Sequence, residues 1–113
     1  MDTLFEILWY VEESGKIPFN EWVSSLKDKK VRAVIDARLS RLSLGLMGDC
    51  KTIQGAGDIR ELRIDFSAGC RVYFSQVGKK IVLLLIGGDK STQSKDIKKA
   101  KLFLEDYNRR KNG

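Results

Sequence analysis

The chain has 113 residues, which is enough for one domain with a single core but not for two. Its formal net charge is +6 and its pI is about 9.4, a balance that favours an anionic partner, most commonly nucleic acid. Histidine is absent, which removes the commonest general base and most zinc sites. We therefore expect neither a metal nor another cofactor.

The compartment is suggested by what the chain lacks. Cys50 and Cys70 have no redox or zinc-binding spacing and give little support to a disulfide framework. No apolar run reaches the roughly 18 residues of a membrane-spanning helix. The first residues lack the basic region of a signal peptide. These features predict a cytoplasmic protein.

The N-terminal half predicts one strand and a helical hairpin. Residues 4–11 are apolar nearly throughout and predict the strand. Pro18 suits the first turn of a helix over 18–26, and a stripe of aliphatic residues predicts a longer helix over 28–44. The basic side chains of the longer helix are typical of a solvated face. Residues 45–57 contain four glycines without periodicity and predict a connecting loop.

The clearest pattern is the alternation of apolar and polar residues over 58–66 and again over 70–75. It predicts an antiparallel hairpin with one core face and one polar face. A turn at residues 67–69 would place Phe66 opposite Cys70 on the core face. On the polar face the expected opposite pairs are Asp65 with Arg71, Arg63 with Tyr73, and Glu61 with Ser75.

The C-terminal part predicts a central strand and a last helix. Residues 81–86 form a continuous apolar run, which is typical of a strand covered on both faces. A glycine turn follows, and residues 91–94 offer N-cap side chains for a basic helix with an apolar stripe. The order β-α-α-β-β-β-α predicts an α+β domain. We expect the helical hairpin and the C-terminal helix to pack on one face of a small, mainly antiparallel sheet.

The polar face of the hairpin could support phosphodiester cleavage. Arg63 and Arg71 offer forked donors that suit phosphate, and Lys90 adds a charge at the glycine turn before the last helix. Tyr73 could donate a hydrogen bond or stack on a base. Cleavage by an internal 2′-hydroxyl also needs a base, which could be Asp65, Glu61 or a lysine whose pKa is lowered.

Pattern alone favours a simpler interpretation. Asp65 opposite Arg71 is typical of an exposed cross-strand ion pair, which is worth only about 0.2–1 kcal/mol. A glycine turn is more often a plain connection than an anion-binding loop. Composition and spacing therefore stop at a basic α+β domain with a candidate phosphate-binding sheet face.

The motifs themselves resemble a known family. The segment ELRIDFSAGCRVYF at residues 61–74, followed by GGDKSTQSKDI at 87–97, resembles the RelE/ParE superfamily of bacterial toxins. More narrowly, it is similar to the HigB-like, phage-related addiction module killer proteins. Phe19 with Trp22, and the segment at 38–42, fit the same branch.

This resemblance implies a microbial-RNase-like fold and a toxin of a type II toxin–antitoxin system. Such toxins are neutralised by an antitoxin encoded nearby, in this branch a helix-turn-helix protein, and bind operator DNA only through the antitoxin complex. RelE- and HigB-type members cleave mRNA in the ribosomal A site without a metal. The C-terminal tyrosine or histidine that some members use has no clear counterpart here, which leaves the general base open.

Carried over by position, Arg71 matches the arginine after the small-residue turn, and Lys90 falls near the basic residue after the last core strand. Arg63 lies on the strand where RelE-like toxins place catalytic lysines. The candidate catalytic set is therefore Arg63, Arg71, Lys90, Tyr73 and Asp65.

Two other functions stay open. A ParE-like toxin, which has the same fold, would inhibit DNA gyrase by binding, although Arg71 and Lys90 favour a nuclease. The chain could also be a non-catalytic regulatory partner of an antitoxin. Charge further suggests that an acidic antitoxin segment covers the C-terminal helix, where Lys98, Lys99 and Lys101 lie.

Overall fold

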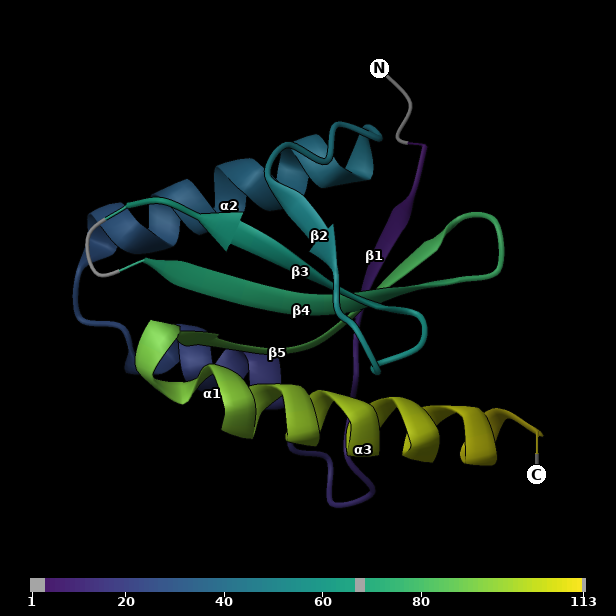
Figure 1. Cartoon of the computed structure of the whole chain (residues 1–113). Coiled ribbons are helices and arrows are strands. Elements are labelled where there is room, and N and C mark those ends of the chain that lie inside the picture. Colours follow the sequence, from purple (N-terminus) through teal and green to yellow (C-terminus); the bar gives the residue numbers. More distant parts are fainter. Residues whose placement is uncertain (1–3, 67–68, 113) are drawn as a thin grey trace.

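A five-stranded sheet with helices on both faces forms the fold, in a computed structural model that describes residues 4–66 and 69–112 (Figure 1). The sheet order is β1-β5-β4-β3-β2; β1 runs parallel to β5 and the other neighbours are antiparallel. The α+β class and the mainly antiparallel sheet are confirmed. The strands are β1 (Glu6–Trp9), β2 (Cys50–Thr52), β3 (Ile59–Ile64), β4 (Cys70–Val77) and β5 (Ile81–Asp89). The helices are α1 (Pro18–Ser25), α2 (Lys29–Ser43), a 3-10 turn (Lys90–Thr92) and α3 (Gln93–Asn112).

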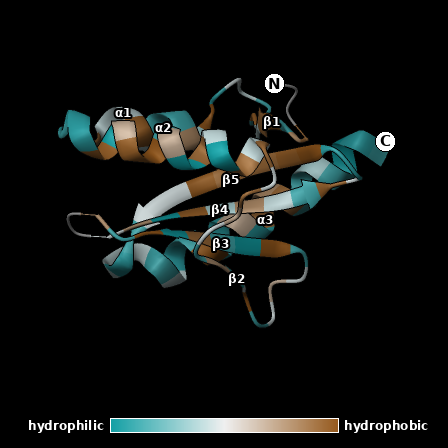
Figure 2. Cartoon of the chain, turned by 90° about the horizontal axis from the view of Figure 1, so that it is seen from above, coloured by the Kyte–Doolittle hydropathy of each residue, from teal (hydrophilic) through white to brown (hydrophobic). Residues whose placement is uncertain are grey.

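The helices divide between the two faces of the sheet. Phe19 of α1 and Ile35 of α2 pack against Val72 on one face, whereas Ala100 of α3 packs with Tyr73 and neighbouring residues on the other. Figure 2 shows the apolar residues, in brown, along β5 and in bands within α1 and α2. The expectation that all helices lie on one face is wrong, because β5 is apolar on both faces and each face needs a cover.

The predicted helices agree closely with the observed ones. Pro18 opens α1, and the Asp28 carboxylate caps α2 by accepting from the Lys30 N–H at 2.9 Å. α3 begins at Gln93, within the segment 91–94 where the N-cap side chains of the last helix were expected. Ahead of it, Asp89 caps the 3-10 turn by accepting from the Ser91 N–H at 2.8 Å. β5 extends through its glycines as far as Asp89, which brings this carboxylate to the start of the turn.

Residues 45–57 are not entirely a loop. β2 lies within them and pairs with β3, so that Cys50 is opposite Leu62. This edge strand is short and largely exposed, and it has no periodicity of its own. It depends on the free edge of β3, a neighbour that local sequence does not reveal. Within the described ranges, no helix has the length and apolarity needed to cross a bilayer.

The β3–β4 hairpin pairs two residues away from the expected register. Arg63 is opposite Arg71, and Glu61 is opposite Tyr73. The expected pairs of Asp65 with Arg71 and of Phe66 with Cys70 are wrong, because residues 65 and 66 lie beyond β3 and are exposed. A shift of two residues leaves every side chain on its predicted face. Part of the expected turn, residues 67 and 68, lies outside the described residues.

β5 is the central strand that the apolar run predicted, since Val82–Gly88 are all buried. Its pairing with β4 contains a bulge: Phe74 is opposite Leu84, but Tyr73 is opposite Ile86. Leu85 is therefore an extra residue in β5. Leu85 and Ile86 both pack in the cluster beneath α3.

Candidate phosphate-binding site

A cavity of about 240 Å³ lies where β3 ends, β4 begins and the 3-10 turn starts. Arg63, Asp65, Arg71 and Lys90 line it, so the structure brings together four of the five predicted site residues. Asp49, from the loop before β2, adds a second carboxylate. We call this space the cationic cavity, because its lining holds three cationic groups and two carboxylates.

The buried carboxylate of Glu61 holds the two arginines of the site in place. Its side chain is 4% exposed, and Oε1 accepts from Arg63 Nε and from Arg71 Nη1, each at 3.2 Å. Oε2 accepts from the Tyr73 hydroxyl at 3.2 Å and from Gln93 Nε2 at 2.8 Å. Four donors thus occupy this carboxylate, which makes Glu61 a positioning residue rather than a base. The alternation placed Glu61 on this face but could not show that it is the common acceptor.

The two arginines lie directly opposite each other on neighbouring strands. Like charges in this position repel, and the shared Glu61 carboxylate compensates for them. Arg71 is the more enclosed, with 12% of its side chain exposed against 34% for Arg63. Among the residues that the structure describes, Arg71 Nε has no hydrogen-bond partner. Glu61 therefore holds both guanidinium groups in place, and Arg63 is the more accessible of the two to an anion in the cavity.

Tyr73 does not line the cavity. Its ring is fully buried in the cluster beneath α3, and it reaches the site only through its hydrogen bond to Glu61. Burial and the adjacent carboxylate raise its pKa above the ordinary tyrosine value. The expected stacking of Tyr73 on a base is wrong, because the sheet face that carries it is covered by α3.

Two residues that sequence reasoning missed hold the strand that carries Arg63. Arg38 of α2 donates from Nη1 to the Arg63 carbonyl at 2.7 Å and from Nη2 to the Met47 carbonyl at 3.3 Å. The Arg63 N–H in turn donates to the Asp49 carbonyl at 2.9 Å. The pattern of α2 predicted a solvated basic face and did not distinguish Arg38. Asp49 lies in a segment that showed no pattern at all.

The order of the sheet, with a helical hairpin on one face and a long helix on the other, defines a RelE-like fold. The structure of the Escherichia coli toxin RelE, a double arginine-to-alanine mutant in the free state, matches this chain with a TM-score of 0.60. The match covers 90% of this chain and 96% of that one, at 14% identity. At this identity, the likeness establishes the fold alone.

Sequence comparison places the chain in a particular family. It is 47% identical over 90 residues to an uncharacterised protein of Haemophilus influenzae strain Rd. The aligned residues make up 80% of this chain and 89% of the relative. The chain belongs to the same family as this protein. No family model matches the chain.

Proposed function

We propose that this chain is the toxin of a type II toxin–antitoxin pair and that it cleaves mRNA on the ribosome. The observation that carries the proposal is the cationic cavity, in which Arg63, Arg71 and Lys90 surround a space that can hold a phosphate group. Asp49 and Asp65 supply carboxylates in the same lining. The RelE-like fold supports the toxin assignment.

In the proposed reaction, the 2′-oxygen of a nucleotide attacks the adjacent 3′-phosphorus, and the bond from phosphorus to the 5′-oxygen breaks. The products are a 2′,3′-cyclic phosphate and a 5′-hydroxyl. Asp65 or Asp49 accepts the 2′-hydroxyl proton, and Lys90 donates a proton to the leaving oxygen. Arg63 and Arg71, held by Glu61, stabilise the negative charge on the phosphorane.

The remaining parts of the proposal follow the HigB-like branch that the motifs resemble. A helix-turn-helix antitoxin encoded nearby neutralises the toxin in the cytoplasm. The substrate is mRNA in the ribosomal A site, and operator DNA is bound only through the antitoxin complex. Coverage of the lysines at 98, 99 and 101 by an acidic antitoxin segment stays a prediction.

A purified translation system tests the proposal. Wild-type protein should cut a translated mRNA within its reading frame, and Arg71→Ala should slow cleavage by about 100- to 1,000-fold, as expected when one stabilising donor is lost. Arg41→Ala, which removes an exposed arginine of α2, is the matched control and should cleave at the wild-type rate. Circular dichroism of each variant separates loss of chemistry from loss of folding.

Expression in cells, combined with the translation assay, distinguishes the other functions. Intact mRNA together with DNA breaks on expression in cells would favour a ParE-like gyrase inhibitor. Intact mRNA and normal growth would favour a non-catalytic partner of an antitoxin. Either result would overturn the nuclease proposal.

A further inference from the structure

The second half of β5 has a neighbouring strand on one side only. β1 pairs with β5 over Ile81–Leu84, and the Tyr10 N–H then donates to the Leu84 carbonyl at 2.9 Å. β5 continues to Asp89. Beyond Leu84, within residues 4–66 and 69–112, only β4 pairs with it. An uncovered strand edge presents backbone N–H and C=O groups to which an extended peptide can add.

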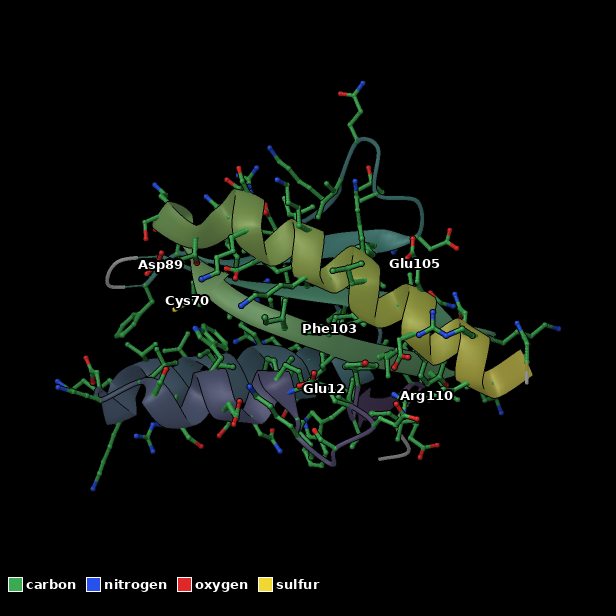
Figure 3. The ribbon with its side chains drawn as sticks, turned by 90° about the horizontal axis from the view of Figure 1, so that it is seen from below. Glu12, Cys70, Asp89, Phe103, Glu105 and Arg110 are labelled. Atoms are coloured by element: carbon green, nitrogen blue, oxygen red, sulfur yellow. The ribbon has the colours of Figure 1, made fainter. Side chains whose placement is uncertain are left out.

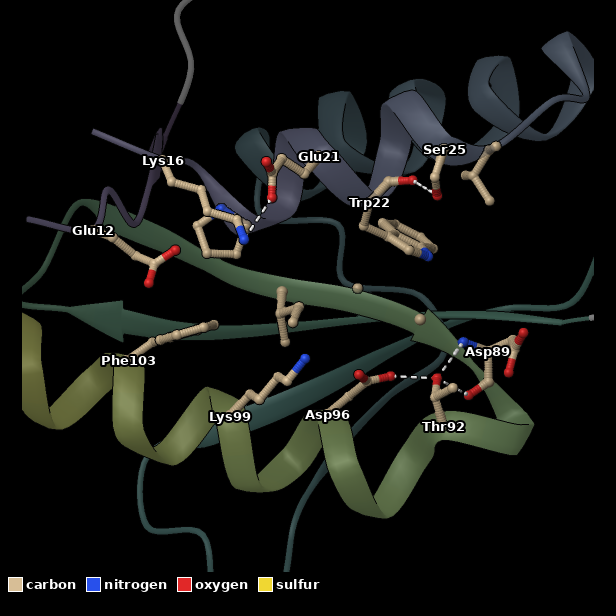
Figure 4. A pocket seen from close by; sticks show the side chains of 15 residues that line it. Glu12, Lys16, Glu21, Trp22, Ser25, Asp89, Thr92, Asp96, Lys99 and Phe103 are labelled. Carbon is tan, nitrogen blue, oxygen red and sulfur yellow. Dashed lines mark hydrogen bonds and ion pairs between the residues drawn. The ribbon is translucent and has the colours of Figure 1, made fainter. Parts of the chain in front are cut away.

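A groove of about 680 Å³ opens along this edge, lined by α1 and α3. Figure 3 places Glu12 and Phe103 between these helices, and Figure 4 shows Trp22 and Asp96 on opposite sides of β5. The part of β5 that lines the groove includes Gly87 and Gly88. These two glycines let Trp22 and Asp96 lie directly against the two faces of β5, since a methyl group at either position would collide with one of these side chains.

The groove is acidic although the molecule is basic. Its charged lining consists of four carboxylates and two ammonium groups: Glu12, Glu21, Asp89, Asp96, Lys16 and Lys99. One ammonium group is already paired, since Lys16 Nζ lies 3.1 Å from Glu21 Oε2. Asp96 is 5% exposed and accepts from the Thr92 hydroxyl at 2.6 Å. An arriving cation would therefore meet excess negative charge, with one carboxylate held in a fixed position.

We propose that this acidic groove binds an extended segment of a partner protein, which adds as a sixth strand beside Leu85–Asp89 and directs a lysine or arginine at Asp96. Successive side chains of a strand point to opposite faces of the sheet. A basic residue would thus meet Asp96 on the α3 side, and its neighbour in the segment would meet Trp22 on the α1 side. The segment of the partner protein therefore alternates basic and apolar residues.

Charge argues against an acidic peptide or a nucleic acid at this groove, because both would face the same carboxylates. The inference does not depend on the proposed nuclease function. The residues that line the acidic groove and those that line the cationic cavity do not overlap.

The probe for this inference is a blocked hexapeptide that alternates valine and arginine, titrated into the 15N-labelled protein. Saturable changes in amide chemical shift should be centred on Leu85–Asp89, at peptide concentrations below about 1 mM. Asp96→Asn should weaken binding about tenfold, the equivalent of about 1.4 kcal/mol. Asp36→Asn, which neutralises an exposed carboxylate of α2 outside the groove, is the matched control and should bind as the wild type does.

Two N-methylated peptides test the strand addition itself. Methyl groups on one set of alternate residues block the N–H groups that face β5, whereas methyl groups on the other set block those that face solvent. Only one of the two peptides should lose binding. The inference is overturned if both bind equally, if a valine–glutamate peptide binds as well, or if no amide of β5 shifts by about 1 mM peptide. Arg71→Ala should bind the peptide normally, which keeps this result separate from the cleavage test.

Discussion

The cationic cavity and the acidic groove lie on either side of the end of β5 and differ in almost every physical respect. Lys90 contributes to the cavity and its sequence neighbour Asp89 to the groove. The cavity is the smaller of the two, and its two arginines share one buried carboxylate that accepts from four donors. The groove is larger and follows an unpaired strand edge. A net charge of +6 therefore describes the average of two opposite surfaces.

We expect the largest effect from replacing Glu61, the buried carboxylate that accepts from all four donors. Glu61→Ala leaves two guanidiniums, a phenol and an amide without their shared partner, two of them deeply enclosed. We expect a loss of about 3–5 kcal/mol in the free energy of unfolding, measured by urea denaturation. Glu61→Gln keeps the shape and should lose less. A loss below about 1 kcal/mol for the alanine variant would contradict the central role given to Glu61.

A milder change affects the cavity without disturbing the fold. Lys90 is exposed, so Lys90→Ala should alter the free energy of unfolding by no more than about 0.5 kcal/mol. If Lys90 is the general acid, mRNA cleavage should slow by about 100-fold. Lys101→Ala, at an exposed position of α3, is the control with the same loss of charge. Equal cleavage rates for the two variants would remove Lys90 from the mechanism.

On the groove side, Gly88→Ala should distort the wall formed by α3. A methyl group there would collide with the Asp96 carboxylate and would lie 2.6 Å from the Thr92 hydroxyl oxygen. We expect a loss of about 1–3 kcal/mol in the free energy of unfolding, because the hydrogen bond between Thr92 and Asp96 must break or shift. Ser94→Ala, at an exposed position of α3, serves as the control. An unchanged free energy of unfolding would mean that α3 can shift away from Gly88 at little energetic cost.

The smallest effect concerns pH. Burial raises the pKa of Asp96 above its ordinary value of 3.8, although the Thr92 hydroxyl, Lys99 and Lys95 favour the charged form and Asp89 disfavours it. Folding thus favours the protonated carboxyl. The stabilisation is complete below pH 3.8 and is lost as the pH rises through the raised pKa. The Tm of Asp96→Asn should therefore improve relative to wild type between about pH 3 and about pH 7. A difference in Tm between the two proteins that stays constant with pH would refute this prediction.

Local patterns predicted most of the elements and the face on which each side chain lies. Pro18 and the aliphatic stripe of residues 28–44 were sufficient for the helical hairpin, and alternation separated the apolar from the polar residues of β3 and β4. The grouping of Arg63, Arg71 and Lys90 was also predictable, since it needs only a hairpin followed by a strand that returns beside it.

The features that the sequence did not predict depend on contacts between distant segments. The register was predicted two residues out because both registers keep Leu62 and Val72 on the core face, so hydrophobic pattern does not choose between them. β2 and Asp49 are defined by the edge of β3 and not by their own sequence. The burial of Tyr73 could not be predicted while α3 was assigned to the same face as the other helices.

The bulge in β5 also decides which helix each of the two glycines of this strand faces. Because Leu85 and Ile86 both face α3, the residues after them change sides: Gly87 lies against Trp22 of α1 and Gly88 against Asp96 of α3. Loss of the bulge without any change in the length of the strand would restore regular alternation and exchange the faces of the two glycines. Asp89 and Lys90 would then shift by one position against β4 and would no longer align with the cap and the cavity. Substitutions that remove the bulge should therefore alter the groove and the cavity together.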